Sequence, residues 1–282
     1  MNLPKRTAKK EVEALKKWCT NLPHLKFNAD EEWLMVFLYS CKFNVEKAKT
    51  KIETFYIMRQ VIPELFTNRD PNLPKIQEII KKGIVVPIKQ SETHQKTILY
   101  FSFGDPDRYP IVLLLKTYYM ILDVLLMDEA TKFFEYDLLI DLKGFSAKYE
   151  EELTPNMIKI LLRYFEDGYP LNVKHVHFIN PPPYAMPTLN LVLMFVPGKK
   201  RAKIHVHCEN EDFDVTSIYP LLGPVFNTDQ EGVRRVFNDV CVEWKLKMDD
   251  YRKWLMQNAF LFTLDLAQRP EDGNTFLNPF NL

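Results

Sequence analysis

The sequence predicts an α/β protein in which an N-terminal helical bundle precedes a mostly parallel sheet flanked by helices. From Glu11 to Gln60, apolar residues recur at helical spacing until Pro63 stops the run. From residue 84 to residue 207, strand-like segments alternate with helices of about 10 to 25 residues, a spacing typical of crossovers between parallel strands. A long uncharged segment in the second half indicates a lid over an apolar cavity.

The N-terminal elements have recognisable boundaries. Asn44 is a good N-cap for a helix whose apolar residues follow at helical spacing: Val45, Ala48, Ile52, Phe55 and Tyr56. Turn-forming residues from Asn68 to Pro74 then lead into a short helix that Gly83 ends. These signals predict a small helical bundle followed by a separate domain.

Five strands and their connecting helices are expected next. The strands are Ile84–Ile88, Thr97–Phe103, Tyr136–Leu142, Val173–Ile179 and Lys203–His207, with helices at Ile111–Phe134 and Pro155–Glu166. Residues 229–257 indicate one or two closing helices capped by Thr228 or Asp229, and irregular coil is expected after Arg269. The predicted domains are a helical domain at 1–72, a sheet domain at 73–240, and a C-terminal helix and tail at 241–282.

The uncharged segment runs from Phe178 to Gly198, 21 residues without one charged side chain. Five prolines confine any helix within it to Tyr184–Val196. This is well short of the ~20 apolar residues that span a bilayer. The segment therefore indicates a lid over an apolar cavity, able to touch a membrane without crossing it.

Composition limits the classes of function. The 37 Lys and Arg residues balance 37 Asp and Glu residues, so no overall field favours nucleic acid. Four distant cysteines, Cys19, Cys41, Cys208 and Cys241, indicate free thiols in a reducing compartment. The basic N-terminus is not followed by an apolar run, so no secretory signal is expected. A cytoplasmic monomer, peripheral at membranes, is the expectation.

Several motifs resemble one known family. Phe37-Leu38 followed by Cys41–Ala48 is similar to the N-terminal helices of the CRAL-TRIO family of lipid-binding proteins. The strand motifs of its lipid-binding domain are matched in order and spacing by Asp141–Ser146, Gly168–Leu171, His177–Pro182 and Lys203–His207. The resemblance covers about Glu11 to Leu255. It is strongest to insect proteins similar to α-tocopherol transfer protein, in the same family as cellular retinaldehyde-binding protein.

The resemblance implies a cytosolic carrier that binds a small isoprenoid-like hydrophobic ligand, such as a retinoid, tocopherol-like or terpenoid compound, and exchanges it at membranes. No enzymatic activity and no cofactor are implied. Two alternatives remain open: a phosphatidylinositol or phospholipid transfer protein, and a lipid-sensing regulatory adaptor. The lid departs from the family where Leu193-Met194-Phe195 replaces Lys-Pro-Phe, which removes one basic residue.

Matching to the family's ligand-contacting elements gives the candidate pocket residues. Each of them could equally be ordinary core, since stripes of Leu, Tyr and Phe also build cores. Hydroxyls of Tyr118, Tyr136, Tyr164 and Tyr169 could supply polar selectivity. The candidates are Leu115, Tyr118, Leu122, Tyr136, Leu138, Ile140, Leu153, Leu161, Phe165, Tyr169, Val176, Phe178, Leu191, Val192, Phe195 and Val196.

A basic patch is the second implied feature. Positions that bind phosphoinositide headgroups in the tocopherol-carrier branch correspond to Arg59, Lys174, Lys199 and Lys203, and two further positions are Asn172 and Leu193. The implied partner is a transient membrane surface carrying phosphoinositide. Alternatively, these basic residues belong to an ordinary solvated face of the protein.

Two His-x-His pairs raise the question of a metal site. The spacing places His175 with His177, and His205 with His207, on one face of their strands, as zinc could require. No Cys or carboxylate spacing completes a site, so a structural role is preferred and no metal is expected. Without a Gly-x-Ser-x-Gly turn or a phosphate-binding glycine loop, no catalytic residue is expected either.

Overall fold

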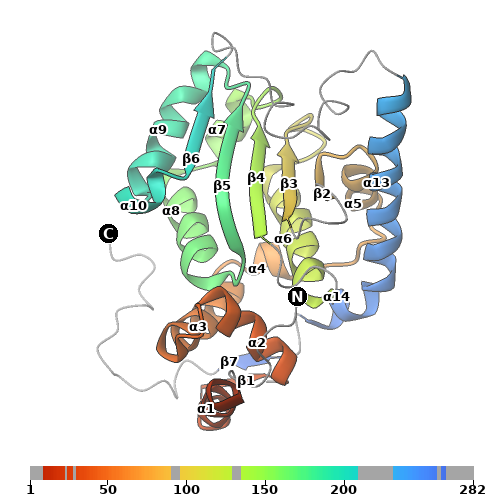
Figure 1. Ribbon diagram of the computed structural model, residues 1–282. Helices are drawn as coiled ribbons and strands as arrows, with labels where there is room; N and C mark the ends of the chain where they lie inside the picture. The colour runs from red at the N-terminus through yellow and green to blue at the C-terminus, as the bar shows by residue number, and fades with distance from the viewer. Residues whose placement is uncertain are drawn as a thin grey trace. The chain divides into compact units, whose positions relative to one another are not determined.

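The computed structural model divides into two compact units. The helical unit comprises Met1–Thr67, Lys159–Leu171 and Gln257–Leu282, and the sheet unit comprises Asn68–Ile158 and Asn172–Met256. Figure 1 shows the elements of both. The expected domain boundaries near residues 72 and 240 stay a prediction. The residues that the structure describes are 9–22, 24–27, 30–89, 96–128, 135–208, 231–258 and 262–264.

The helical unit contains the predicted bundle. It is built from α1 (Lys9–Thr20), α2 (Glu31–Ser40) and α3 (Val45–Val61), followed by the short α4 (Pro63–Phe66). The Asn44 carboxamide oxygen accepts a hydrogen bond of 3.0 Å from the backbone N–H of Lys47, which confirms the predicted N-cap.

Two elements of the helical unit were not predicted. Strand β1 (Leu25–Phe27) pairs antiparallel with β7 (Phe262–Leu264), joining segments far apart in the sequence. The helix predicted over residues 155–166 is α8 (Pro155–Arg163), and it continues as a π-helical turn at Tyr164–Gly168. Such turns at the ends of helices leave no simple periodic signal.

The core of the helical unit is aromatic. Phe55 on α3 contacts Trp33 and Phe37 of α2, and also Tyr164 in the π-helical turn and Tyr169 just after it. The rings of Tyr164 and Tyr169 meet edge to face at a centroid distance of 5.6 Å. Edge-to-face pairs of this kind add specific geometry to the area that each ring buries.

The sheet unit contains the predicted, mostly parallel sheet, in the order β2-β3-β4-β5-β6. The strands are β2 (Val85–Lys89), β3 (Lys96–Ser102), β4 (Glu135–Asp141), β5 (Asn172–Ile179) and β6 (Ile204–His207). Strand β2 forms an antiparallel hairpin with β3, and every other pair is parallel. Each strand begins or ends within one residue of the predicted position.

The register gives the sheet two distinct faces. Phe101, Ile140, Phe178 and Val206 are side by side on neighbouring strands, and we call their side the pocket face. The next register row holds Tyr100, Leu139, His177 and His205, and its side is called the histidine face. Because side chains alternate along a strand, the two rows point in opposite directions.

Helices of the sheet unit lie on both faces. On the pocket face, α6 (Ile111–Met127) brings Tyr118 to Phe101 at a ring-centroid distance of 5.7 Å. On the histidine face, α13 (Glu231–Asp250) brings Phe237 to Tyr100 at 6.5 Å. The helix α5 (Pro74–Lys81) ends as predicted before Gly83, whose φ of 64° is in the left-handed region.

The end of α6 differs from the sequence prediction, whereas the closing region agrees with it. Helix α6 ends at Met127 and not at Phe134, because Asp128 is extended and its carboxylate pairs with Lys247 of α13. The closing region is two helices, α13 and α14 (Arg252–Asn258). The predicted caps Thr228 and Asp229 and the coil after Arg269 lie outside the described residues. No helix in the described part of the chain is long and apolar enough to cross a membrane.

Candidate functional site

The candidate site is centred on the pocket face of the sheet, where α6 packs. The contact between Tyr118 and Phe101 places the predicted stripe Leu115, Tyr118 and Leu122 on this face. Sheet register places the predicted strand residues there as well: Tyr136, Leu138, Ile140, Val176 and Phe178. The structure therefore brings eight candidates from three elements to one surface.

Burial separates these candidates into two groups. Leu122, Tyr136, Leu138 and Phe178 are buried. Leu115, Tyr118, Ile140 and Val176 are only half-buried. Removing apolar surface from water lowers the free energy of the system. A hydrophobic ligand would therefore bind most favourably against the half-buried group, which still has apolar surface to bury.

Tyr118 adds a polar atom to this surface. Burial raises the pKa of its hydroxyl well above the ordinary value, so the group stays protonated. Among the described residues, no hydrogen-bond partner faces this hydroxyl, while its ring contacts Phe101 and Tyr119. Because the side chain is only half-buried, a ligand oxygen could reach this hydroxyl and accept a hydrogen bond from it.

The uncharged segment forms a short 3₁₀ turn, Pro183–Ala185, and then helix α9, Met186–Phe195. Within α9 only Leu189 is buried. Leu191, Val192 and Phe195 are half-buried, Met194 is 63% exposed, and Val196 after the helix is buried. An apolar helix with so little burial has a face that is incompletely packed.

Helix α9 is tied at its start to α7 (Ala147–Glu152). The Thr188 hydroxyl donates a hydrogen bond of 3.0 Å to Oε1 of Glu150, and the Tyr184 hydroxyl donates to the backbone oxygen of Phe145. At the other end, the Arg201 guanidinium donates to the backbone oxygen of Val196 at 3.3 Å. No charged side chain lies between these two attachments.

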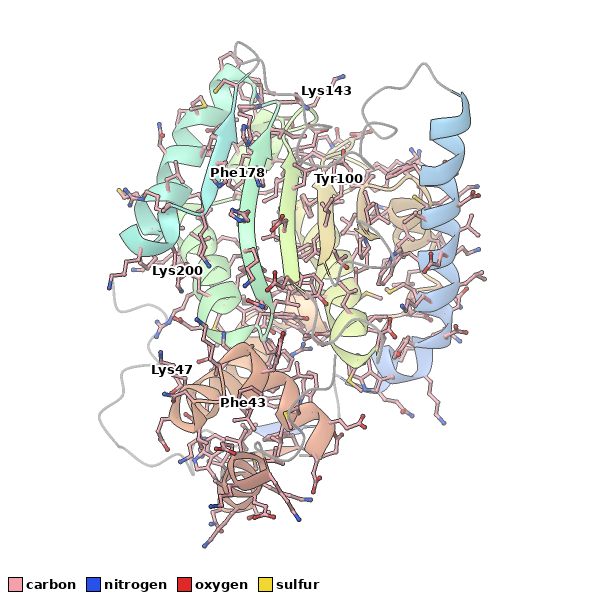
Figure 2. All side chains as sticks on the ribbon, viewed as in Figure 1. Phe43, Lys47, Tyr100, Lys143, Phe178 and Lys200 are labelled. Atoms are coloured by element: carbon pink, nitrogen blue, oxygen red, sulfur yellow. The ribbon has the colours of Figure 1, made fainter. Side chains whose placement is uncertain are left out.

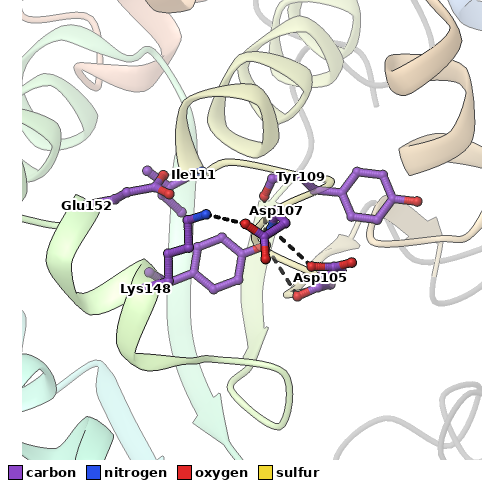
Figure 3. A network of polar contacts seen from close by, with 8 residues as sticks. Asp105, Asp107, Tyr109, Ile111, Lys148 and Glu152 are labelled. Carbon is purple, nitrogen blue, oxygen red and sulfur yellow. Dashed lines mark hydrogen bonds and ion pairs between the residues drawn. The ribbon is translucent and has the colours of Figure 1, made fainter.

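A polar network fixes α7 to the start of α6 (Figure 3). Glu152 Oε2 accepts a hydrogen bond of 2.8 Å from the backbone N–H of Ile111, and the Tyr149 hydroxyl donates to the backbone oxygen of Tyr109 at 2.7 Å. Lys148 forms an ion pair with Asp107. Helix α7 is therefore a fixed support on which α9 begins.

Four further pocket candidates belong to other parts of the chain. Leu153 is half-buried just after α7. Leu161, Phe165 and Tyr169 belong to the helical unit, where Tyr169 is 1% exposed in the aromatic core around Phe55. Tyr164, another candidate for polar selectivity, lies in the same core.

A small cavity also lies in the helical unit. Its volume is about 30 Å³, and it is lined by Thr54, Ile57, Met58, Val61, Lys159, Ile160 and Arg163. A volume of that order holds about a water molecule and no lipid chain.

The four basic candidates have different environments. Arg59 is 4% exposed, and its guanidinium lies over the rings of Phe55 and Phe66, 4.0 and 4.6 Å from their centroids. Lys174 pairs with Glu135 at 2.8 Å. Lys199 and Lys203 are exposed in and just after α10 (Gly198–Arg201), where Figure 2 shows Lys200 extending from the molecule.

The two histidine pairs come together on the histidine face. His177 and His205 are register partners with ring centroids 4.8 Å apart, and Nδ1 of His177 lies 3.0 Å from Nε2 of His207. Burial, together with the neighbouring His205 and His207, lowers the pKa of His177 to about 4. Spacing along either strand could not show that the pairs are neighbours.

Sequence reasoning did not identify the residues that support α9. Glu150 and Thr188 meet only because α7 and α9 pack together, and nothing in their spacing indicates it. Phe101 and Phe103 had a detectable signal, since alternation on β3 puts them on one face. Their ring centroids are 5.3 Å apart, and the ring of Phe103 also contacts that of Phe145 at a centroid distance of 5.2 Å.

Comparison with known proteins gives two family matches and a group of relatives. The CRAL/TRIO domain matches residues 81–219, and the Pinta-like UBA domain matches residues 4–76. Clavesin-1 of Xenopus laevis is 24% identical over 77% of this chain and 65% of its own length. Clavesin-2 of Mus musculus is 23% identical over 77% of this chain and 66% of its own length.

The chain thus spans just under two thirds of the length of these two clavesins. Among solved structures, the crystal structure of Sfh5 aligns with a TM-score of 0.46 at 14% identity, covering 73% of this chain and 82% of that chain.

Proposed function

Because the chain belongs to the CRAL/TRIO family of lipid-binding proteins, we propose that it is a cytosolic carrier of a small isoprenoid-like lipophile. The ligand occupies the pocket face beside α6, α9 closes over it, and exchange takes place at membranes. The observation that carries the proposal is α9 itself, an uncharged apolar helix of which only Leu189 is buried. The carrier is proposed to act as a monomer and to catalyse no reaction.

Hydrophobic burial can supply the affinity. A ligand of ~15 carbons gains ~0.8 kcal/mol per CH₂ removed from water, or ~12 kcal/mol before the cost of association. The half-buried side chains Leu115, Ile140 and Val176 offer the matching protein surface. A tightly bound, poorly soluble ligand is therefore energetically reasonable.

Polar selectivity is assigned to Tyr118. Its hydroxyl lacks a partner among the described residues, whereas Tyr164 and Tyr169 belong to the helical unit and Tyr136 is 1% exposed. A single phenol can satisfy one hydroxyl or carbonyl group of a ligand. The preferred ligand is thus a lipophile with one small neutral polar group.

The basic residues argue against a phospholipid as the main ligand. A buried phosphate headgroup needs several cations around it. Arg59 is buried against two phenylalanine rings and Lys174 is engaged by Glu135, which leaves Lys199 and Lys203 from the original set. Two exposed lysines suit attraction to an anionic membrane surface better than they suit a headgroup clamp.

Gating follows from the two attachments of α9. The network around Glu152 and Tyr149 holds α7 in place. The segment from Thr188 to Val196 can therefore move while α7, to which it is hydrogen-bonded, stays fixed. In water the apolar side of α9 covers the ligand. At a membrane the same side can enter the interface, where lipid replaces the ligand contacts.

Native mass spectrometry of the purified full chain tests the proposal. The expected result is a one-to-one complex with a neutral lipophile that is released on collisional activation. A co-purified phospholipid would overturn the proposal in favour of phospholipid transfer. A chain that stays empty after incubation with mixed neutral lipids would overturn the carrier role altogether.

A further inference from the structure

The histidine face holds a cluster that the proposed carrier role does not use. His175 and His177 on β5, and His205 and His207 on β6, all point to this face because His177 and His205 are register partners. The ring centroids of His175 and His205 are 5.6 Å apart, and those of His177 and His207 are 5.2 Å apart. Four of the six histidines of the chain are therefore neighbours.

Three of these rings have nitrogen atoms close enough to share one ion. One ligand nitrogen each from His175, His177 and His205 lies within 4.8 Å of the other two. Zinc binds imidazole nitrogen at ~2.0–2.1 Å, which sets ligand nitrogens of a tetrahedral site ~3.4 Å apart. His175 is exposed and His205 half-buried, so small rotations of these side chains can close the difference without moving the strands.

The surroundings favour a cation. Asp137 on β4 is 1% exposed, and its carboxylate acts on His177 as a nearby negative charge. The same carboxylate accepts a hydrogen bond of 3.1 Å from the backbone N–H of His175. Buried carboxylates behind ligating histidines orient the rings and balance the charge of the ion.

His207 supplies a second orienting contact. Its Nε2 lies 3.0 Å from Nδ1 of His177, and the two rings are nearly parallel, with an interplanar angle of 9°. A hydrogen bond to one nitrogen of a histidine fixes which nitrogen is presented on the other side of the ring. His177 is thus the most constrained of the three rings.

We propose that His175, His177 and His205 form a binding site for one divalent transition-metal ion, with zinc as the preferred ion. Imidazole ligands suit zinc, copper and nickel, whereas calcium and magnesium require oxygen ligands. Three protein ligands leave a fourth position for water. The sequence argument against a metal was that neither pair had a third ligand, and the pairing of β5 with β6 supplies it.

The position of the site indicates what the ion does. His175 and His177 precede α9 in the chain, and His205 follows it. The ion would therefore join β5 and β6, the two strands that the α9 segment connects. Among the described strands, β6 is at the edge of the sheet, and it has four residues. A metal cross-link would hold this short edge strand in register without entering the pocket face.

Zinc chloride titration of the full chain, after removal of metals by a chelator, tests the site. Isothermal titration calorimetry should show one zinc ion per chain with micromolar or tighter affinity, and zinc should raise the melting temperature. His175→Ala and His205→Ala should each weaken binding by at least tenfold. His24→Gln replaces a histidine of the helical unit that lies beside Glu53, and it should bind zinc as the parent does.

Cobalt(II) gives an independent measurement, because a tetrahedral site produces strong visible absorption that hexaaquo cobalt lacks. These bands should appear in the parent and be lost in His205→Ala. Absence of zinc binding by the folded parent would overturn the proposal. Undiminished binding in both cluster variants, or an equal loss in His24→Gln, would overturn it too, since the ion would then bind elsewhere. None of these results depends on whether the chain carries a lipid.

Discussion

The ring of Tyr118 on α6 meets the ring of Phe101 on β3 edge to face, with centroids 5.7 Å apart and an interplanar angle of 86°. This contact fixes the rotation of α6 about its axis. It places Leu115 and Tyr118 toward the sheet face that also carries Ile140 and Phe178. The phenol ring therefore has a packing role, and its hydroxyl is available for a separate one.

Tyr118→Phe should separate these two roles. The ring and its contact with Phe101 are kept, so the melting temperature should be unchanged. Affinity for a lipophile bearing one hydroxyl or carbonyl should fall about fivefold, the equivalent of a hydrogen bond worth ~1 kcal/mol. Competition with a fluorescent lipid measures the change. The matching hydrocarbon without the polar group is the control, and an equal loss for both ligands would mean that Tyr118 acts only through packing.

Phe195→Asp should disturb α9 in both of its states. In the closed state the carboxylate would lie against apolar groups, and in the membrane-bound state it would face hydrocarbon, each costing several kcal/mol. Ligand retention in solution and ligand transfer between vesicles should both fall by an order of magnitude or more.

Asn190→Asp is the matched control, because it adds the same charge to an exposed position of α9. It should leave both measurements close to those of the parent. Unaltered retention and transfer in folded Phe195→Asp would show that α9 is not the gate.

Membrane docking should depend on the lysines around α10. The double variant Lys199→Glu and Lys203→Glu reverses two exposed charges, each worth ~1 kcal/mol near an anionic surface. Sedimentation with phosphatidylserine vesicles at low salt should show at least a tenfold loss of binding, and the salt dependence should weaken. Lys143→Glu reverses an exposed lysine elsewhere in the sheet unit (Figure 2) and should bind as the parent does. Equal binding by all three proteins would assign the lysines to an ordinary solvated surface.

Stability at acid pH should reflect the ion pair between Asp70 and Arg252. The guanidinium donates two hydrogen bonds of 2.8 Å to the Asp70 carboxylate, and this lowers the Asp70 pKa from 3.8 to about 2. A lowered folded-state pKa contributes stability above the unfolded value, and that contribution is lost as the pH falls from 3.8 toward 2.

Asp70→Asn should therefore melt roughly 2 °C below the parent at pH 7, a small shift because both side chains are partly exposed. The difference should shrink toward zero near pH 2. Melting curves recorded by circular dichroism across this range measure it. A difference that stays constant with pH would mean that the variant changes packing and not the ion pair.

Local signals allowed most of the fold to be predicted from the sequence. Asn44 and Gly83 mark element ends through capping and left-handed geometry, which depend on neighbouring residues alone. The end of α6 was misplaced because it depends on Asp128 pairing with Lys247, 119 positions away. The pairing of β1 with β7 was missed for the same reason, since neither three-residue strand has a periodic pattern of its own.

The candidate site was predictable only in part. Residues on one strand or helix, such as Leu115 and Tyr118, could be grouped because periodicity places them on one side. Periodicity does not reveal contacts between different elements. Those contacts determine the environments of Arg59, Tyr169 and the histidines. Arg59 was predicted to face a membrane, but the rings of Phe55 and Phe66 cover it.

A hydrophobic ligand should occupy the pocket face of the sheet beside α6, with α9 closed over it. Ile140→Trp tests it most directly, because Ile140 is half-buried on that face and an indole there would fill volume meant for lipid. Leu246→Trp is the matched control, since it adds the same ring to an exposed position of α13. The measurement is the affinity of each protein for a fluorescent lipid. The melting temperature is recorded as well, to show that each variant is folded. Affinity should fall at least tenfold in Ile140→Trp and stay parental in Leu246→Trp; parental affinity in both would contradict ligand binding on the pocket face.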